Sequence, residues 1–405
     1  MIPAAPPAAA AKGEPEGKTV GINRREFIYT AGLFGLAAQA PLAFGQAQRY
    51  WLYVGTYTSG KSKGIYLYEW STDGKLRSHG LAAESVNPSF LAIHPNRRFL
   101  YAVGEVASLE GKRTGGVRAF TIDPATGRLR LLNQQPSAGA GPCHLTVDPV
   151  GRHVLVANYG GGTVAVLPID QQGQLREPCC VVSHQGKSVN PKRQEAPHPH
   201  SVNLDASGRF AIVADLGLDR VYVYRYDAER GELKANDPPF ASVAAGAGPR
   251  HFAFHPSGKF AYVINELANT VTAFHWDASQ GVLREIQTIS TLPQDFSGTS
   301  YTAEVLVHPS GQWLFGSNRG HDSLSVFCVD TSSGKLTLVG IVSDGIRWPR
   351  NFNIDPSGRF VLVASERGDN IVVFELNAKT GELKRLASEE NVPTPVCLKF
   401  VPIAA

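Results

Sequence analysis

A six-residue phrase recurs six times along the chain, and its spacing constrains the fold more than any other feature. A typical copy is His255-Pro256-Ser257-Gly258-Lys259-Phe260. The copies begin at His94, Asp148, Asp205, His255, His308 and Asp355. Counted on the second residue of each copy, the steps are 54, 57, 50, 53 and 47 residues. A repeat of about 50 residues indicates an array of supersecondary units that share one architecture.

Each copy lies between two short runs rich in Val, Ile, Phe and Tyr, such as residues 252–254 and 260–264. Such runs suit strands and are too short for helices, and the Pro and Gly between them are typical of a hairpin turn. A third run follows at 270–276, and a fourth begins at 282 after a second turn. Four antiparallel strands in a repeat of about 50 residues predict a propeller blade.

The two ends of the chain supply one further blade. Residues 50–57, 64–70 and 75–77 match a second, third and fourth strand but lack the innermost one. Residues 395–400 have the pattern of that missing strand. We therefore predict an all-β, seven-bladed β-propeller whose ring is closed by the C-terminal strand pairing into the N-terminal blade. Closure leaves no open sheet edge, whereas the alternative of six blades and a separate hairpin would expose one.

The first 47 residues differ from the rest and predict an export signal. Residues 1–22 are rich in Pro, Ala and Gly and predict a disordered segment. The pair Arg24-Arg25 precedes Phe27 and a moderately apolar stretch, and small residues end this segment at Ala47. This order resembles a twin-arginine signal, which implies recognition by the twin-arginine export machinery, cleavage after Ala47 and a periplasmic location. The alternative is a disordered tail with an incidental Arg pair. The predicted domains are therefore a disordered N-terminus with its signal, residues 1–47, and the propeller, residues 48–405.

Composition excludes several functional classes. The chain is 43% hydrophobic and 18% charged, with a net charge of +4, which is too weak and dispersed to favour nucleic-acid binding. Residues 50–405 contain no long apolar run, so we expect no membrane span in the mature chain. Five cysteines without regular spacing predict neither a disulfide framework nor a structural zinc site. We expect neither a metal nor a cofactor.

Propeller topology separates polar residues by face. Each first strand runs along the channel and the second returns, so the recurrent turns lie at one face and the opposite strand ends lie at the other. The first position of the recurrent phrase is His in three copies, at His94, His255 and His308, and Asp in the other three. Because either residue fits this position, we interpret these histidines as structural turn residues. At the other face the polar residues differ between blades. They include Glu105, His144, Asn158, His198, His200, Asp215, Arg250, His251, Glu266, Glu304, Asn318, Arg319, Arg350 and Glu366.

A ring would gather these His, Arg and carboxylate groups around one mouth, and convergent charged groups predict a binding or catalytic site. Individually, several have structural alternatives. His144 or His200 could be a hydrogen-bonded core histidine. Glu266 could be a structural partner of Arg250, and Asp215 could cap a turn.

Several phrases resemble those of a known family. They are Pro197-His198-Pro199-His200-Ser201, Ala214-Asp215-Leu216-Gly217, Gly248-Pro249-Arg250-His251, Asn265-Glu266, Ala303-Glu304-Val305 and Ser317-Asn318-Arg319-Gly320-His321-Asp322. They are similar to the seven-bladed propeller lactonases, which include bacterial 6-phosphogluconolactonases and fungal carboxymuconate lactonizing enzymes. The resemblance spans about residues 50–402. It implies that His200, Arg250, Glu266 and Arg319 are the catalytic residues.

The resemblance implies hydrolysis of a small-molecule sugar lactone, without a metal. Ring opening needs an activated water and stabilisation of the oxyanion. Glu266 or His200 is the expected general base, and Arg250 and Arg319 are expected to hold the oxyanion or a substrate carboxylate. Further substrate-binding or orienting residues are expected at His144, His198, Asp215, His251, Glu304 and Asn318. The alternatives are a carboxymuconate-type lactonizing cycloisomerase, which needs the same groups, and a non-catalytic periplasmic binding propeller.

Overall fold

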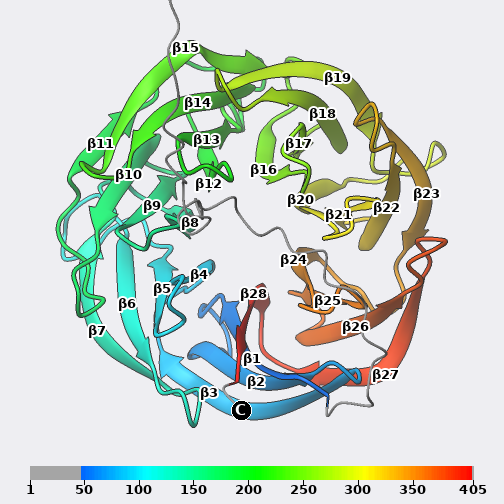
Figure 1. The fold of residues 1–405 in the computed structure, drawn as a ribbon, viewed down its shortest axis with the longest axis horizontal. Coiled ribbons are helices and arrows are strands. Elements are labelled where there is room, and N and C mark those ends of the chain that lie inside the picture. The colour runs from blue at the N-terminus through cyan, green and yellow to red at the C-terminus, as the bar shows by residue number, and fades with distance from the viewer. Residues whose placement is uncertain (1–46, 404–405) are drawn as a thin grey trace, which may run out of the picture. The chain divides into compact units, whose positions relative to one another are not determined.

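A computed structural model describes residues 47–403, and every regular element within them is a β-strand. The described residues form seven sheets of four strands each. Figure 1 shows the sheets arranged as blades around a central axis. The predicted all-β, seven-bladed propeller is confirmed.

Each blade runs from an innermost strand beside the axis to an outermost strand at the rim. The innermost strands are β4 (Leu91–Ile93), β8 (Pro142–Val147), β12 (Pro199–Leu204), β16 (Pro249–Phe254), β20 (Tyr301–Val307), β24 (Pro349–Ile354) and β28 (Pro395–Pro402). The second strands are β1 (Arg49–Thr56), β5 (Phe99–Gly104), β9 (His153–Asn158), β13 (Phe210–Asp215), β17 (Phe260–Asn265), β21 (Trp313–Arg319) and β25 (Phe360–Ser365).

The third strands are β2 (Gly64–Ser71), β6 (Gly116–Ile122), β10 (Thr163–Pro168), β14 (Arg220–Asp227), β18 (Thr270–Asp277), β22 (Ser323–Val329) and β26 (Asn370–Leu376). The outermost strands are β3 (Lys75–Glu84), β7 (Leu129–Pro136), β11 (Cys180–Ser183), β15 (Glu232–Ser242), β19 (Val282–Ser290), β23 (Leu336–Val342) and β27 (Leu383–Asn391). Neighbouring strands within each blade pair antiparallel, as in β16–β17–β18–β19.

The ring closes through the pairing of β28 with β1. This register begins with Tyr50 opposite Pro402 and ends with Thr56 opposite Pro395. In Figure 1 the red C-terminal strand lies inside the blue N-terminal strands of the same blade. The predicted closure is confirmed, and the alternative of six blades with a separate hairpin is wrong.

The hydrophobic core lies between adjacent blades. All six residues of β17 are buried, because blades pack against both faces of this strand. One apolar cluster joins Phe210 and Val221 of one blade to Phe252 and Phe274 of the next. The outermost strands expose part of their length, so the buried interfaces hold the inner strands in place around the channel.

The histidines of the recurrent turns are structural, as predicted. The Nε2 atom of each lies within hydrogen-bond distance of a glycine carbonyl oxygen in the next blade's turn. The pairs are His94–Gly151 at 2.9 Å, His255–Gly311 at 2.9 Å and His308–Gly358 at 2.8 Å. These contacts link consecutive blades at the face opposite the mouth.

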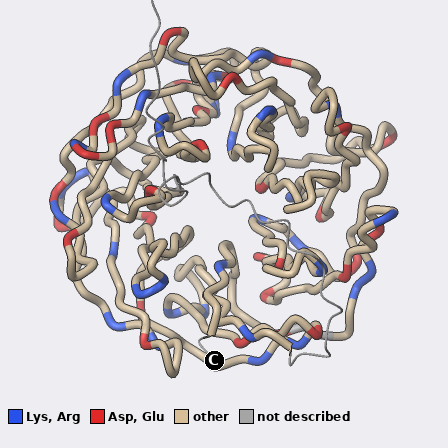
Figure 2. The backbone as a smooth tube through the Cα atoms, viewed as in Figure 1, with Lys and Arg blue, Asp and Glu red and all other residues tan. Residues whose placement is uncertain are grey.

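Acidic and basic residues are interspersed around the rim of the ring (Figure 2). Within residues 47–403 no helix is long and apolar enough to cross a membrane. The twin-arginine segment before residue 47 lies outside the described residues, and both this signal and the cleavage after Ala47 remain predictions.

Candidate active site

A β-bulge at the start of the innermost strand aims side chains into the channel mouth. In β12, Pro199 pairs with Asp215 and Ser201 with Ala214, so His200 is the extra residue. The same skip occurs in four other blades. The corresponding extra residues are Cys143, Arg250, Arg350 and Val396. Bulges leave one residue unpaired and redirect its side chain, which explains how these strands present different groups at one level.

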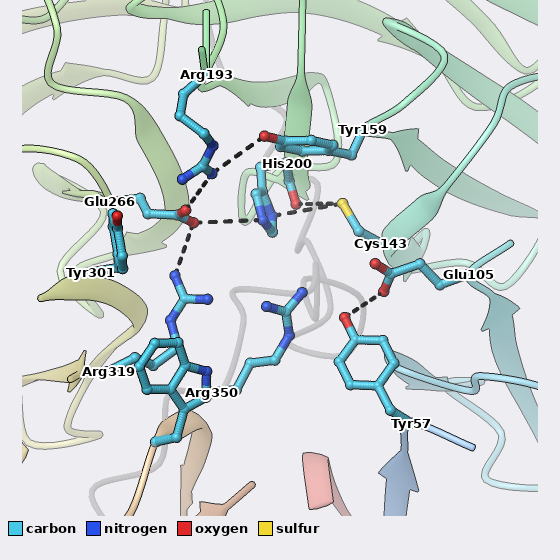
Figure 3. Close-up of a pocket in the computed structure, with 11 residues that line it drawn as sticks. Tyr57, Glu105, Cys143, Tyr159, Arg193, His200, Glu266, Tyr301, Arg319 and Arg350 are labelled. Carbon is cyan, nitrogen blue, oxygen red and sulfur yellow. Dashed lines mark hydrogen bonds and ion pairs between the residues drawn. The ribbon is translucent and has the colours of Figure 1, made fainter. Parts of the chain in front are cut away.

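The ends of the second strands complete the mouth. Side chains from these ends, from the bulges, from the start of β20 and from two connections line a cavity of about 380 Å³. Its lining residues are Tyr57, Glu105, Cys143, Tyr159, Arg193, His200, Glu266, Tyr301, Arg319, Trp348 and Arg350. Figure 3 shows that these side chains approach from all sides of the ring.

Glu266 is the centre of a buried ion-pair cluster. Its Oε2 accepts hydrogen bonds or ion pairs from Arg250 Nε at 2.9 Å and Arg319 Nη2 at 3.0 Å. Its Oε1 pairs with Arg193 Nη2 at 2.6 Å. Burial alone would raise the pKa of Glu266, but the charges of Arg319, Arg250 and Arg193 outweigh it and lower the pKa to about 2. Glu266 is therefore a carboxylate throughout the physiological pH range.

His200 lies beside this cluster as a neutral imidazole. Its Nε2 is 3.9 Å from Glu266 Oε2, and its Nδ1 is 3.6 Å from the thiol of Cys143. Burial, followed by the positive charge of Arg250, lowers the pKa of His200 well below 6.5. Burial also raises the pKa of the Cys143 thiol to about 12, so the sulfur is protonated at neutral pH.

The opposite wall of the cavity contains Arg350, Tyr57 and Glu105. The Tyr57 hydroxyl donates to Glu105 Oε2 at 2.9 Å, and the Arg350 guanidinium lies 5.2 Å from the Tyr57 ring centroid. Among residues 47–403, Arg350 has no hydrogen-bond or ion-pair partner. Burial would lower its pKa, but the nearby Tyr57, Glu105 and Glu366 raise it, so Arg350 is charged. Figure 3 shows this guanidinium pointing into the cavity without a bonded neighbour.

The four residues expected to be catalytic converge, but in two layers. His200, Glu266 and Arg319 line the cavity. Arg250 is 1% exposed and does not line it, because its guanidinium is bonded to Glu266 and to the Ala303 carbonyl oxygen at 2.7 Å. Burial and then the charges of Arg350 and Arg319 lower the pKa of Arg250 to about 9, so it is still a cation at neutral pH.

Three residues expected to bind or orient substrate lie deeper in the channel, outside the cavity lining. His251 Nδ1 is 2.8 Å from Glu304 Oε1, whose second oxygen accepts from Asn351. The His144 ring packs 5.2 Å from that of His251 and 4.1 Å from that of Phe90. Burial lowers the pKa of His251 to about 4, so this layer is packed around a neutral imidazole.

The other three expected residues hold the blade ends together. Asp215 accepts from the backbone N–H of His198 and Gly217 at 2.8 and 3.0 Å, which is the turn-capping role considered as its alternative. His198 stacks on Tyr159 with ring centroids 4.3 Å apart. Asn318 donates to three oxygens of its own blade and of the preceding connection.

Arg193 was not found by sequence reasoning. It lies in the connection between β11 and β12, and it pairs with Glu266 over a sequence separation of 73 residues. Tyr57, Tyr301 and Trp348 also line the cavity without having been expected to. The extra length of the 184–198 connection was the one signal available, since no other blade has an equivalent. Arg350 and Glu105 were noted at the mouth but had no assigned role.

No group of three or more His, Cys, Asp or Glu side chains within residues 47–403 is arranged to hold a metal ion. The five cysteines, all in this part of the chain, are free. The side chains that line the cavity include a neutral imidazole, a permanent carboxylate and several guanidinium groups.

Known proteins match the chain over the whole propeller. The family model "Lactonase, 7-bladed beta-propeller" matches residues 51–400. The chain is 41% identical over 350 residues to the 6-phosphogluconolactonase of Bacillus subtilis (strain 168), covering 86% of this chain and 97% of that protein. It is 31% identical over 344 residues to a 6-phosphogluconolactonase of Formosa agariphila, covering 84% of this chain and 96% of that one.

Among solved structures, the periplasmic gluconolactonase of Pseudomonas aeruginosa superimposes with a TM-score of 0.83 at 36% identity. The match covers 88% of this chain and 100% of the Pseudomonas aeruginosa chain. Fold, length and sequence therefore agree over the whole propeller. The chain belongs to the family of seven-bladed β-propeller lactonases.

Proposed function

We propose that the protein hydrolyses a sugar lactone in the cavity between Glu266 and Arg350. The observation that carries the proposal is the guanidinium of Arg350, which enters the cavity unpaired and faces the neutral His200 side of the site. An unpaired cation in a buried cavity favours a ligand that brings or develops negative charge. The names of the relatives, 6-phosphogluconolactonase and gluconolactonase, support a sugar lactone as that ligand.

His200 is the proposed general base, rather than Glu266. Glu266, with a pKa of about 2, is a very weak base because three guanidinium groups stabilise its charge. His200 is neutral and can accept a proton at Nε2, where the Glu266 carboxylate 3.9 Å away would stabilise the resulting imidazolium. Water thus loses a proton to His200 while its oxygen attacks the lactone carbonyl carbon.

Arg350 and Arg319 are the proposed oxyanion ligands. Arg319 lines the cavity and bonds Glu266 and the Thr302 carbonyl through Nη2 alone, so its Nη1 remains available. The tetrahedral intermediate collapses by breaking the bond between the carbonyl carbon and the ring oxygen, which takes the proton from His200. The product is an open-chain hydroxy acid. Arg250 does not touch the lactone in this scheme and instead orients Glu266.

The deeper residues are proposed to support this site rather than to contact substrate. The channel beneath the site is filled by His251, Glu304 and His144. The mouth end of the blade that carries His200 is stabilised by the hydrogen bond between Asp215 and the His198 backbone. Asn318 orients the end of β21, from which Arg319 projects.

Export to the periplasm is proposed as well. The order of residues in 23–47 supports it, as does the similarity to a periplasmic gluconolactonase.

The decisive experiment combines a substrate panel with a pH–rate profile. The purified mature protein should hydrolyse glucono-lactone or its 6-phosphate, and kcat/KM should fall as the pH drops through the lowered pKa of His200, below 6.5. Replacement His200→Gln should reduce kcat about 10²- to 10⁴-fold. The matched control is His275→Gln, an exposed histidine on β18, which should retain wild-type kinetics.

Three outcomes would contradict parts of the proposal. Near wild-type kcat in His200→Gln, together with loss of turnover in Glu266→Gln, would assign the base to Glu266 instead. Conversion of an open muconate to a lactone, without net lactone hydrolysis, would identify the cycloisomerase. Absence of turnover on every lactone, with measurable lactone binding, would favour the binding propeller.

A further inference from the structure

The connection that carries Arg193 is folded back on itself. It spans residues 184–198 between β11 and β12 and contains no strand. Ser188 N donates to Gln194 O at 2.9 Å, and Gln194 N donates to Asn190 O at 2.8 Å. The side chain of Gln194 is fully buried and its Oε1 accepts from Asn190 N at 3.1 Å. The tip of the connection is thus a closed turn with Arg193 beside its buried residue.

Asp219 accepts two of the hydrogen bonds that attach this turn to the propeller, and Gln194 Nε2 also donates to the Leu216 carbonyl oxygen at 2.9 Å. Asp219 Oδ1 accepts from Gln194 Nε2 at 2.8 Å, and Oδ2 accepts from Ser188 Oγ at 2.5 Å. The same two oxygens also accept from the backbone N–H groups of Gly248 and Gly246, both at 2.7 Å. Asp219 is 4% exposed, so all four hydrogen bonds are shielded from water.

The four hydrogen bonds of Asp219 act on both sides of the Glu266 cluster. Gln194 directly follows Arg193, and Gly248 lies two residues before Arg250. The Gly248 carbonyl oxygen in turn accepts from the backbone N–H of Glu266 at 2.7 Å. One carboxylate in the β13–β14 turn therefore sets the spacing between the Arg193 turn and the strand entry that carries Arg250.

Arg193 is the most exposed arginine of this cluster. Its side chain is 34% exposed, compared with 2% for Arg250 and 7% for Arg319. It uses Nη2 for Glu266 and for the Tyr159 hydroxyl, at 2.6 and 3.4 Å. Its Nε and Nη1 have no hydrogen-bond partner within residues 47–403, although the side chain lines the cavity.

We propose that Asp219 is a positioning residue that fixes the Arg193 turn over the cavity, and that Arg193 thereby determines the affinity for the lactone. This inference rests on the proposed lactone hydrolysis. Loss of either residue removes binding shared by the ground state and the transition state, so it raises KM and leaves kcat nearly unchanged.

The test variant is Asp219→Asn. The turn tolerates asparagine, because Asn269 occupies the equivalent β17–β18 turn with the same φ of 54°. In asparagine an NH₂ group replaces one of the two accepting oxygens. At the Oδ1 position this group would face the N–H groups of Gln194 and Gly248. At the Oδ2 position it would face the Ser188 hydroxyl and the Gly246 N–H group. We expect KM to rise about tenfold, as for one lost charged hydrogen bond, with kcat within about twofold of wild type. Arg193→Gln should give the same change.

A double-mutant cycle separates positioning from general destabilisation. In the Arg193→Gln background, Asp219→Asn should raise KM no further, because the arginine it positions is already absent. The control is Asp205→Asn in the turn at the other end of the same blade. Asp205 is equally buried at 3% and accepts from Phe210 N and Ser207 Oγ, so its replacement should lower stability without raising KM.

A readout independent of catalysis is limited trypsin digestion of the native protein. Lys187 and Lys192 are exposed in the Arg193 turn, so release of the turn should accelerate cleavage there in Asp219→Asn but not in Asp205→Asn. Unaltered cleavage, an unaltered KM, or an equal rise in KM in the Arg193→Gln background would overturn the proposal. If wild-type protein hydrolyses no lactone, the proposed function fails, and the digestion still decides the role of Asp219.

Discussion

Replacement of Glu266 by Gln is the perturbation for which the structure gives the largest energetic effect. The side chain keeps its shape and one oxygen acceptor but loses the charge that three guanidinium groups share. Arg250 is 1% exposed, so its charge cannot be compensated by water. Removing one member of a buried ion pair typically costs about 3–5 kcal/mol, because the partner's charge remains buried.

The pKa of Glu266 gives an independent magnitude. It falls from an ordinary value of 4.5 to about 2 in the folded protein. At about 1.4 kcal/mol per pH unit, this difference corresponds to about 3 kcal/mol of stabilisation at neutral pH. Because the pKa is lowered on folding, the stabilisation is complete above 4.5 and is lost as the pH falls towards 2. The stability difference between wild type and Glu266→Gln should follow the same course.

The assay is urea unfolding followed by tryptophan fluorescence at pH 7, 5 and 3. We expect the variant to be less stable by about 3 kcal/mol at pH 7 and 5, with a clearly smaller difference at pH 3. The control is Glu69→Gln, since Glu69 pairs at 3.4 Å with an Arg49 side chain that is 62% exposed. That change should cost less than about 1 kcal/mol. A Glu266→Gln difference below about 1 kcal/mol at pH 7, or one independent of pH, would refute the reasoning.

Two further predictions follow from Arg350 and from the N-terminal segment. Arg350→Gln should reduce kcat/KM about 10²-fold, which is the cost of losing one oxyanion donor. The urea midpoint should stay near wild type, because this guanidinium has no hydrogen-bond or ion-pair partner within residues 47–403. A large loss of stability with normal turnover would contradict its proposed role. Replacing Arg24 and Arg25 with Lys should leave the precursor in the cytoplasm of a host with active twin-arginine export, as measured by cell fractionation, and normal periplasmic yield would exclude that route.

The repeat made most of the fold predictable from the sequence. Its period identified the blades, and the pattern of residues 395–400 identified the strand that closes the ring. The same logic brought His200, Glu266 and Arg319 together, because equivalent strand ends must meet at one face of a propeller. Arg193 could not be found in this way, since it lies in a connection that has no counterpart in the other blades.

Roles within the mouth were less predictable than positions. Arg250 and Arg350 follow a proline at equivalent strand starts, yet one is bonded to Glu266 and the other is unpaired. The difference depends on which carboxylate the neighbouring blade presents, and that is a property of the assembled ring. The bulges themselves also depend on pairing register, which short apolar runs specify only weakly.

The bulges at the strand starts also bear on how such a ring can acquire different specificities. Because Cys143, His200, Arg250 and Arg350 are the unpaired residues of their bulges, exchanging their side chains leaves the ladder hydrogen bonds of the blade intact. A thiol, an imidazole and two guanidiniums already occupy one backbone environment in this chain. Each of these blades thus offers one position at which the side chain can change without disturbing the strand pairing that holds the propeller together.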